Sequence, residues 1–241
     1  MLEIKELTGG YVNLPVLKKV SFEVPDGQLV GLIGLNGAGK STTINEIIGL
    51  LTPYSGEILI DGLSLGQSPR DYRSKIGYIP ETPSLYEELT LKEHLETVAM
   101  AYGLDVEESL LRIQFLLEKF RLDQKLDWFP VRFSKGMKQK VMILCAYLVD
   151  PRLYIVDEPF LGLDPVAIAD LIDLLESEKA QGKSILMSTH VLDSAEKMCD
   201  SFVILHQGQV KAKGNLEELR AQFGLADASL NDIYLSLTEE V

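Results

Sequence analysis

The chain has 241 residues, of which 46% are hydrophobic and 24% are charged. This length and composition fit one large domain or two small ones around a buried core, and they argue against a disordered or fibrous protein. Asp and Glu number 36 against 23 Lys and Arg, which gives a formal net charge of −13. Because so acidic a chain is a poor match for nucleic-acid phosphates, we expect no nucleic acid as its main partner.

The cysteines and the apolar runs bear on where in the cell the protein is expected to work. Cys145 and Cys199 share no metal-ligand spacing, so we expect reduced, buried thiols of a cytosolic protein. No signal peptide opens the sequence, and apolar runs such as residues 141–149 are far shorter than the ~20 residues that span a bilayer. If the protein serves a membrane, we expect another polypeptide to cross it.

Strand and helix patterns alternate along the chain. Caps at Thr90 and Asp105, each with Glu three residues later, begin a helix-rich block after about residue 82. The expected strands are 2–7, 16–24, 29–33, 57–60, 76–79, 153–156, 184–187, 202–205 and 210–212. The expected helices are 41–51, 90–102, 105–120, 134–149, one from Asp164, 191–198, one from Asn215, and 230–237. The alternation predicts an α/β protein with a largely parallel sheet and ligands at its strand ends.

A glycine-rich loop follows the expected strand 29–33. Residues 34–41 read GLNGAGKS and fit the pattern G-x-x-x-x-G-K-[ST] in full. Glycines let successive backbone N–H groups point at phosphate oxygens, while Lys40 reaches the β- and γ-phosphates and Ser41 ligates Mg²⁺. Because the loop links an apolar strand to a helix, a chance glycine loop is a poor explanation. The motif predicts nucleotide binding, but kinases, GTPases, helicases and transporter motors all carry it.

Two adjacent carboxylates end the expected strand 153–156. At this strand end Asp157 can face Mg²⁺ while Glu158 faces the γ-phosphate and the attacking water. Two solvated carboxylates are the alternative, which an apolar run leading into them disfavours. Shortly before this strand Ser134 begins a helix and Gly136 allows close backbone approach, which makes an anion site. Most serine-capped helices bind nothing, so this site gains weight only from its position.

Taken together, the motifs resemble those of ABC transporter ATP-binding subunits, in the family's order and approximate spacing. Residues 34–42 match Walker A, 134–139 the signature, and 156–158 the end of Walker B. Residues 162–164 match the D-loop, and His190 follows Ser-Thr as the switch histidine does. The segments 78–83, 128–130, 133–140, 157–164 and 199–202 are similar to the Ecs-type ATPases of Gram-positive bacteria, a group associated with secretion of proteins and peptides.

This resemblance implies an ABC-type P-loop NTPase fold: a mixed, mostly parallel sheet with flanking helices, an N-terminal antiparallel β subdomain and an inserted helical subdomain. We expect a single domain, with a catalytic core at 1–81 and 151–214, the helical subdomain at 82–150 and a helical tail at 215–241. The implied catalytic residues are Glu158, His190 and Lys40. The implied ATP contacts are Tyr11, Val16, Gly34, Asn36, Gly37, Ala38, Gly39, Lys40, Ser41, Thr42, Ser134, Gly136 and Met137. The implied Mg²⁺ ligands are Ser41, Asp157 and Glu81.

Some positions depart from the family pattern or have a second interpretation. Glu81 stands where the family commonly has glutamine, which adds negative charge near the γ-phosphate. Lys135 and Met137 replace the usual glycine and glutamine of the signature; Lys135 either adds a cation near the phosphates or faces solvent. Tyr11 either stacks on adenine, as the family's aromatic does, or packs in its hairpin. His190 taken alone would be an ordinary surface or core histidine.

The resemblance also implies partners. One chain carries one copy of each motif and the family's sites join Walker A of one subunit to the signature of another, so we expect a dimer, most simply a homodimer. We further expect an integral membrane permease subunit and a location on the inner face of the cell membrane, with export of peptides or proteins. The alternatives are a non-transport ABC ATPase that acts on ribosomes or DNA, and a P-loop kinase or nucleotide sensor.

Overall fold

The computed structural model describes residues 1–12 and 14–239, and its strands form two sheets. The larger sheet has the order β5-β6-β7-β3-β8-β9, with every pair parallel except the edge pair β8–β9. Its strands are β3 (Leu29–Ile33), β5 (Ile76–Ile79), β6 (Leu153–Asp157), β7 (Ser184–Thr189), β8 (Ser201–His206) and β9 (Gln209–Gly214). The carboxyl ends of β3, β6 and β7 therefore lie at one edge of adjacent strands, where the predicted motifs begin.

The smaller sheet is antiparallel, with the order β2-β1-β4. Its strands are β1 (Leu2–Tyr11), β2 (Leu14–Val24) and β4 (Ser55–Ile60). One buried cluster joins residues of both sheets to Ile44 and Ile47 of α1 (Lys40–Ile47). The apolar face of α1 thus packs between the sheets, and this burial fixes the helix that follows the glycine-rich loop.

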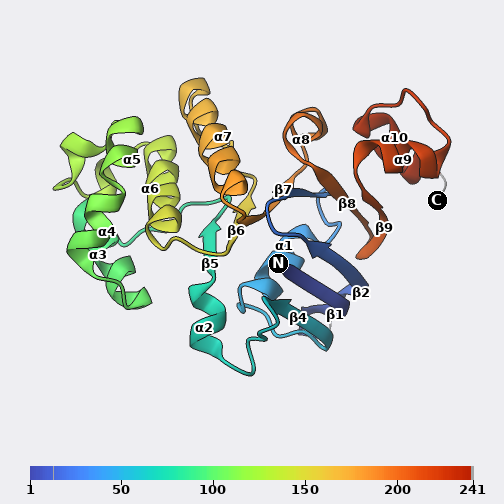
Figure 1. The fold of residues 1–241 in the computed structure, drawn as a ribbon, viewed down its shortest axis with the longest axis horizontal. Helices are drawn as coiled ribbons and strands as arrows, with labels where there is room; N and C mark the ends of the chain where they lie inside the picture. Colours follow the sequence, from blue (N-terminus) through green and yellow to red (C-terminus); the bar gives the residue numbers. More distant parts are fainter. Residues whose placement is uncertain (13, 240–241) are drawn as a thin grey trace.

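Four helices form a helical body at the side of the larger sheet (Figure 1). They are α3 (Leu91–Tyr102), α4 (Val106–Arg112), α5 (Gln114–Lys119) and α6 (Lys135–Leu148), joined by 3₁₀ turns at Asp123–Lys125 and Pro130–Arg132. Thr90 and Glu93 form the expected capping box of α3, and Asp105 caps α4 through the Glu108 amide. Helices thus fill most of the segment 91–148, and their apolar faces share one core with α7 (Pro165–Ala180).

The remaining helices flank the larger sheet near the end of the chain. They are α7 (Pro165–Ala180), α8 (Leu192–Met198), α9 (Leu216–Phe223) and α10 (Leu230–Glu239). Asp164 and Asn215 cap α7 and α9, as expected. Residues 240–241 of the expected tail lie outside the described residues. Within residues 1–12 and 14–239, no helix is long and apolar enough to cross a membrane.

The structure corrects several element boundaries. The short helix α2 (Pro69–Ser74) was not predicted, although Pro69 after Ser68 is a helix-start signal. The helix expected over 105–120 breaks at Ile113 (φ −94°, ψ 4°) into α4 and α5. The helix expected over 41–51 ends at Ile47, because Gly49 turns the chain with a φ of 76°.

Candidate nucleotide site

The glycine-rich loop connects the buried strand β3 to the first turn of α1. Gly37 and Gly39 have φ values of 83° and 112°, a region that residues with a Cβ seldom occupy. Gly39 is the N-cap of α1 and offers no side-chain acceptor. The first N–H groups of α1 therefore have no partner within the helix, and they can bind an anion.

Lys40 lies buried beside this loop. Its Nζ donates a 2.7 Å hydrogen bond to the Gly34 carbonyl, so the side chain folds back over the loop. Burial lowers the pKa of Lys40, while the carboxylates of Glu158, Asp157 and Glu81 oppose this shift. The cation thus sits within electrostatic reach of all three acidic residues that the sequence assigns to the site.

Close backbone packing holds the loop from behind. A Cβ added to Gly34 would lie 2.5 Å from the Leu205 carbonyl oxygen, and the Gly208 amide donates to the Ala38 carbonyl at 3.0 Å. Val16 belongs to the same contact, since a Cβ on Gly208 would lie 1.7 Å from its carbonyl oxygen. The β8–β9 turn and the start of β2, with Val16, therefore support the phosphate loop.

Asp157 ends β6 and is 6% exposed. The Ser188 hydroxyl of β7 donates a short hydrogen bond to its Oδ1. Burial raises the pKa of Asp157, as do the nearby carboxylates of Glu81 and Glu158, whereas the Ser188 bond and Lys40 lower it. Crowded carboxylates of this kind favour a bound cation, because it would offset their mutual repulsion.

Glu158 turns out of the strand direction at the next position. Its φ of 45° is unusual for a residue with a side chain, and its amide donates to the Ser188 carbonyl at 3.1 Å. Glu158 Oε1 lies 2.7 Å from His190 Nδ1, and Oε2 accepts a 3.3 Å bond from the Thr189 hydroxyl. The left-handed turn explains how two consecutive carboxylates serve one site at the end of a strand. The structure thus brings Glu158 and His190 into direct contact.

The other predicted Mg²⁺ ligands are exposed. Ser41 stands in the first turn of α1, and Glu81 follows β5. Among the described residues, no group of three or more His, Cys, Asp or Glu is arranged to hold a metal ion. Mg²⁺ typically takes one or two protein oxygens together with phosphates and waters, so the donors at Ser41 and Asp157 fit a metal that arrives with its nucleotide.

Tyr11 lies at the end of β1 and its side chain is 47% exposed. The Tyr54 hydroxyl donates a short hydrogen bond to its backbone carbonyl. The hydrogen bond fixes the end of the β1–β2 hairpin through the backbone and leaves the ring accessible. The accessible ring fits the stacking interpretation better than the packing one.

The signature residues lie on α6, apart from α1 and the phosphate loop (Figure 1). Ser134 caps α6 through the Met137 amide at 3.3 Å and stays exposed, while the Met137 side chain packs against the helical core. A Cβ on Gly136 would lie 2.4 Å from the Gly162 carbonyl oxygen. The absence of a side chain at Gly136 is therefore explained by its contact with the D-loop of the same chain. Ser134 is exposed at the start of a helix that lies apart from the phosphate loop.

Lys140 adds a link between the signature helix and the D-loop that sequence reasoning did not find. Its Nζ is 3.0 Å from Oδ2 of Asp164, the residue that caps α7. Gln139 on the same helix donates to the Pro80 carbonyl, directly before Glu81. Gln139 ends the signature segment 134–139 and Lys140 directly follows it, but their partners are distant in sequence and give no local signal.

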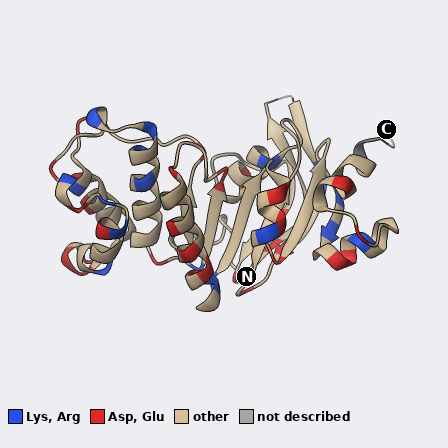
Figure 2. Ribbon diagram, turned by 90° about the horizontal axis from the view of Figure 1, so that it is seen from above, with Lys and Arg blue, Asp and Glu red and all other residues tan. Residues whose placement is uncertain are grey.

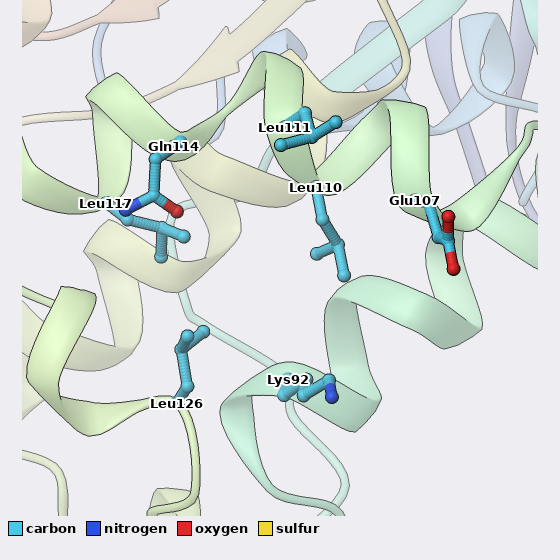
Figure 3. A pocket seen from close by; sticks show the side chains of 7 residues that line it. All are labelled: Lys92, Glu107, Leu110, Leu111, Gln114, Leu117 and Leu126. Carbon is cyan, nitrogen blue, oxygen red and sulfur yellow. The ribbon is translucent and has the colours of Figure 1, made fainter.

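An apolar cavity elsewhere has no part in this site. It lies in the helical body among side chains of α3, α4 and α5 and the segment after them (Figure 3). The lining residues are Lys92, Glu107, Leu110, Leu111, Gln114, Leu117 and Leu126. None of them belongs to the predicted motifs.

Comparison with known proteins identifies the family. The ABC transporter family model matches residues 17–161, more than half of the chain. The chain belongs to the ABC transporter family. It is 60% identical to the ABC-type transporter ATP-binding protein EcsA of Bacillus subtilis (strain 168), over 100% of this chain and 97% of that protein. ABC ATP-binding domains bind nucleotide and are ATPases coupled to transport, so the predicted family, subgroup resemblance and enzyme class are confirmed.

Solved structures confirm the ABC ATPase fold. An ATP-binding subunit of an ABC transporter is 58% identical and superposes with a TM-score of 0.95 over 99% of both chains. A dimeric ATP-binding cassette in a post-hydrolysis state, bound to ADP and Pi, is 26% identical with a TM-score of 0.79, over 90% of this chain and 99% of that one. The mixed, mostly parallel sheet and the antiparallel N-terminal sheet are those of the predicted class.

Proposed function

We propose that this chain is the ATP-hydrolysing motor of a transporter and works as a dimer on a separate membrane subunit, with Mg²⁺ as its metal. The contact between Glu158 and His190, beside the buried Asp157 and Lys40, carries this proposal. In the mechanism, Glu158 holds or deprotonates the attacking water, and His190 keeps its carboxylate in place and reaches the γ-phosphate. Lys40 exchanges the Gly34 carbonyl for phosphate oxygens when ATP enters. Mg²⁺ would neutralise charge on the phosphate oxygens beside Ser41 and Asp157.

The proposed dimer rests on the incomplete nucleotide site of a single chain. Ser134 is an exposed N-cap on a helix remote from the phosphate loop of the same chain. A second copy related by a two-fold axis would bring its Ser134 and Gly136 against the nucleotide bound here, and two sites would form at one interface. The related cassette bound to ADP and Pi is dimeric, which supports this arrangement. In this arrangement bound ATP joins the two subunits, and its hydrolysis lets them separate.

A groove between the strand-rich core and the helical body offers a place for the membrane subunit. Residues of α2 and α3 line it, and the hydroxyl of one of them, Tyr102, donates to the Ile76 carbonyl. Met100 is 63% exposed on the same helix. The Gln139–Pro80 bond connects α6 to the segment of Glu81, and α6 packs against α3, so closure at the nucleotide would move one wall of this groove. In this proposal the chain works at the inner face of the cell membrane and drives export of peptides or proteins.

The distribution of charge disfavours the ribosome or DNA alternative. Lys and Arg occur on both the helical body and the strand-rich part, interspersed with Asp and Glu (Figure 2).

Purification from cells in mild detergent distinguishes a transporter motor from an ATPase that acts on ribosomes or DNA, because the transporter motor should retain an integral membrane protein. Recovery with ribosomes or DNA instead would contradict the transport proposal.

Replacement of Glu158 tests the catalytic assignment. We expect Glu158→Gln to bind ATP normally, to lose at least about a hundredfold in turnover, and to accumulate as an ATP-held dimer, because the amide cannot activate water. Phosphate release and mass by light scattering measure both effects. Glu217→Gln, at an exposed position of α9, is the matched control and should keep full activity. Near-normal hydrolysis by Glu158→Gln would remove Glu158 from its catalytic role.

A further inference from the structure

The last described helix, α10, packs beside the nucleotide site. Its Leu230, Ile233 and Tyr234 are buried in one cluster with Ile33, the residue that ends β3 directly before the phosphate loop. The helix also contacts α8, which begins two residues after His190. Figure 1 shows α9 and α10 together at the β9 edge of the larger sheet. These helices lie outside the segment matched by the family model, which ends at residue 161.

One hydrogen bond joins α10 to the phosphate loop itself. The Leu35 backbone N–H donates to the Tyr234 hydroxyl at 3.0 Å. Tyr234 is 4% exposed, whereas the Leu35 side chain is 58% exposed, so the loop is held here by its backbone. The Leu35 carbonyl in turn accepts from the Ala38 amide at 3.0 Å, and the preceding Gly34 carbonyl receives Lys40. The tyrosine therefore fixes the first residue of the turn that forms the phosphate cradle.

A second bond joins the same helix to the segment that carries His190. The Leu230 N–H, at the start of α10, donates to Glu196 Oε2 of α8 at 2.6 Å. Residues 230 and 234 are four apart and share one face of the helix. One rigid face of α10 thus contacts both sides of the site: the loop that receives the phosphates and the helix after the switch histidine.

We propose that Tyr234 is a positioning residue for the nucleotide and that α10 holds the phosphate loop ready to bind. A glycine-rich loop has many conformations, and ordering it on binding reduces affinity. The Tyr234–Leu35 bond removes part of that cost beforehand, because it fixes the loop without occupying the inward-facing N–H groups. The inference rests on nucleotide binding by the phosphate loop.

Removal of one hydroxyl tests this role. Tyr234→Phe keeps the packed ring and deletes only the acceptor of the Leu35 N–H. From the net worth of one hydrogen bond, we expect ATP and ADP to bind about threefold to tenfold more weakly to the full chain, with KM raised and kcat little changed. We also expect the Leu35 amide to exchange its hydrogen faster by a similar factor in the nucleotide-free chain.

Tyr72→Phe is the matched control. Its buried hydroxyl donates to the Ile47 carbonyl at 2.8 Å, at the far end of α1. This variant should lower the melting temperature as Tyr234→Phe does, but it should leave nucleotide affinity and Leu35 exchange unchanged. Unchanged affinity and exchange in Tyr234→Phe would reduce Tyr234 to a structural residue and overturn the inference. Failure of the unaltered chain to bind nucleotide would overturn the proposed function and the inference with it.

Discussion

At the scale of single residues, Glu46 is a deeply buried carboxyl group outside the predicted site. It lies on α1, is 2% exposed, and packs so closely on Gly9 that a Cβ there would lie 1.7 Å from Oε1. Neither carboxylate oxygen has a hydrogen-bond partner of good geometry among the described residues. Burial raises the pKa of Glu46 from 4.5 to about 7, and the Gly10 amide opposes this only in part. The folded protein therefore favours the neutral acid.

This raised pKa predicts a pH dependence of stability. Between pH 4.5 and 7 the folded chain binds a proton that the unfolded chain has lost, so stability falls as pH rises through this range. We expect Glu46→Gln to match the unaltered chain near pH 4.5 and to be more stable by about 3 kcal/mol at pH 8. Chemical denaturation at both pH values measures the difference. Glu57→Gln, an exposed neighbour on β4, should keep the original slope, and an unchanged slope in Glu46→Gln would contradict the prediction.

At the residue scale, the sequence predicts the site residues Glu158 and His190, while their contact appears only in the structure. The Asp157-Glu158 dipeptide and His190 could be selected from the sequence because each follows an apolar strand. The 2.7 Å contact between Glu158 and His190 could not, since it depends on β6 and β7 being neighbours and on the φ of 45° at Glu158. Ser188 and Thr189, which bond to the two carboxylates, were predicted only as neighbours of His190.

At the scale of elements, the joint between α6 and the D-loop depends on Gly136. Because Gly136 has no Cβ, the Gly162 carbonyl can approach its backbone closely. One helical turn later, Lys140 forms an ion pair with Asp164. The signature helix and the D-loop are thus one unit, and a movement of either shifts the other. The sequence predicted close approach at Gly136, but it did not identify the chain's own loop as the neighbour.

Substitution of Gly136 tests how much the close contact between α6 and the D-loop contributes to stability. We expect Gly136→Ala to lower the free energy of unfolding by about 1–3 kcal/mol, because the methyl group would overlap a backbone oxygen that cannot move freely. Denaturation of the nucleotide-free chain isolates this effect from any role at the nucleotide. Gly66→Ala is the control: an added Cβ meets nothing within 4 Å there, so we expect a change within about 0.5 kcal/mol. If Gly136→Ala lowers the free energy of unfolding no more than the control does, the D-loop can move to accommodate the methyl group, and the prediction is wrong.

At the scale of the whole molecule, the proposed dimer would join two parts of the surface that lie apart in one chain. The phosphate loop and the two carboxylates meet at the strand ends, whereas Ser134 caps α6, which belongs to the helical body (Figure 1). A dimer that completes both sites would place Ser134 at its centre. An obstruction there should therefore stop association without affecting the phosphate loop.

Ser134→Arg in the Glu158→Gln background tests the dimer. We expect ATP to bind the single chain with affinity within about twofold, but not to double its mass in light scattering, because the large side chain occupies the phosphate-facing helix start. Asp105→Ala removes a comparable N-cap from α4, typically worth about 1 kcal/mol, and should leave the ATP-dependent dimer intact. An ATP-dependent dimer that persists in Ser134→Arg would exclude this interface.

The sequence by itself determined the local features: the phosphate loop, the strand-end carboxylates, the helix caps and the alternation that predicts an α/β fold. Each arises from residues adjacent in the chain, where backbone geometry and hydrophobic periodicity act directly. Only the tertiary structure decided which segments meet: Glu158 with His190, Gly136 with Gly162, Lys140 with Asp164, and Tyr234 with Leu35. These contacts join residues 24 to 199 positions apart, because sheet order and packing, not local pattern, bring distant segments together.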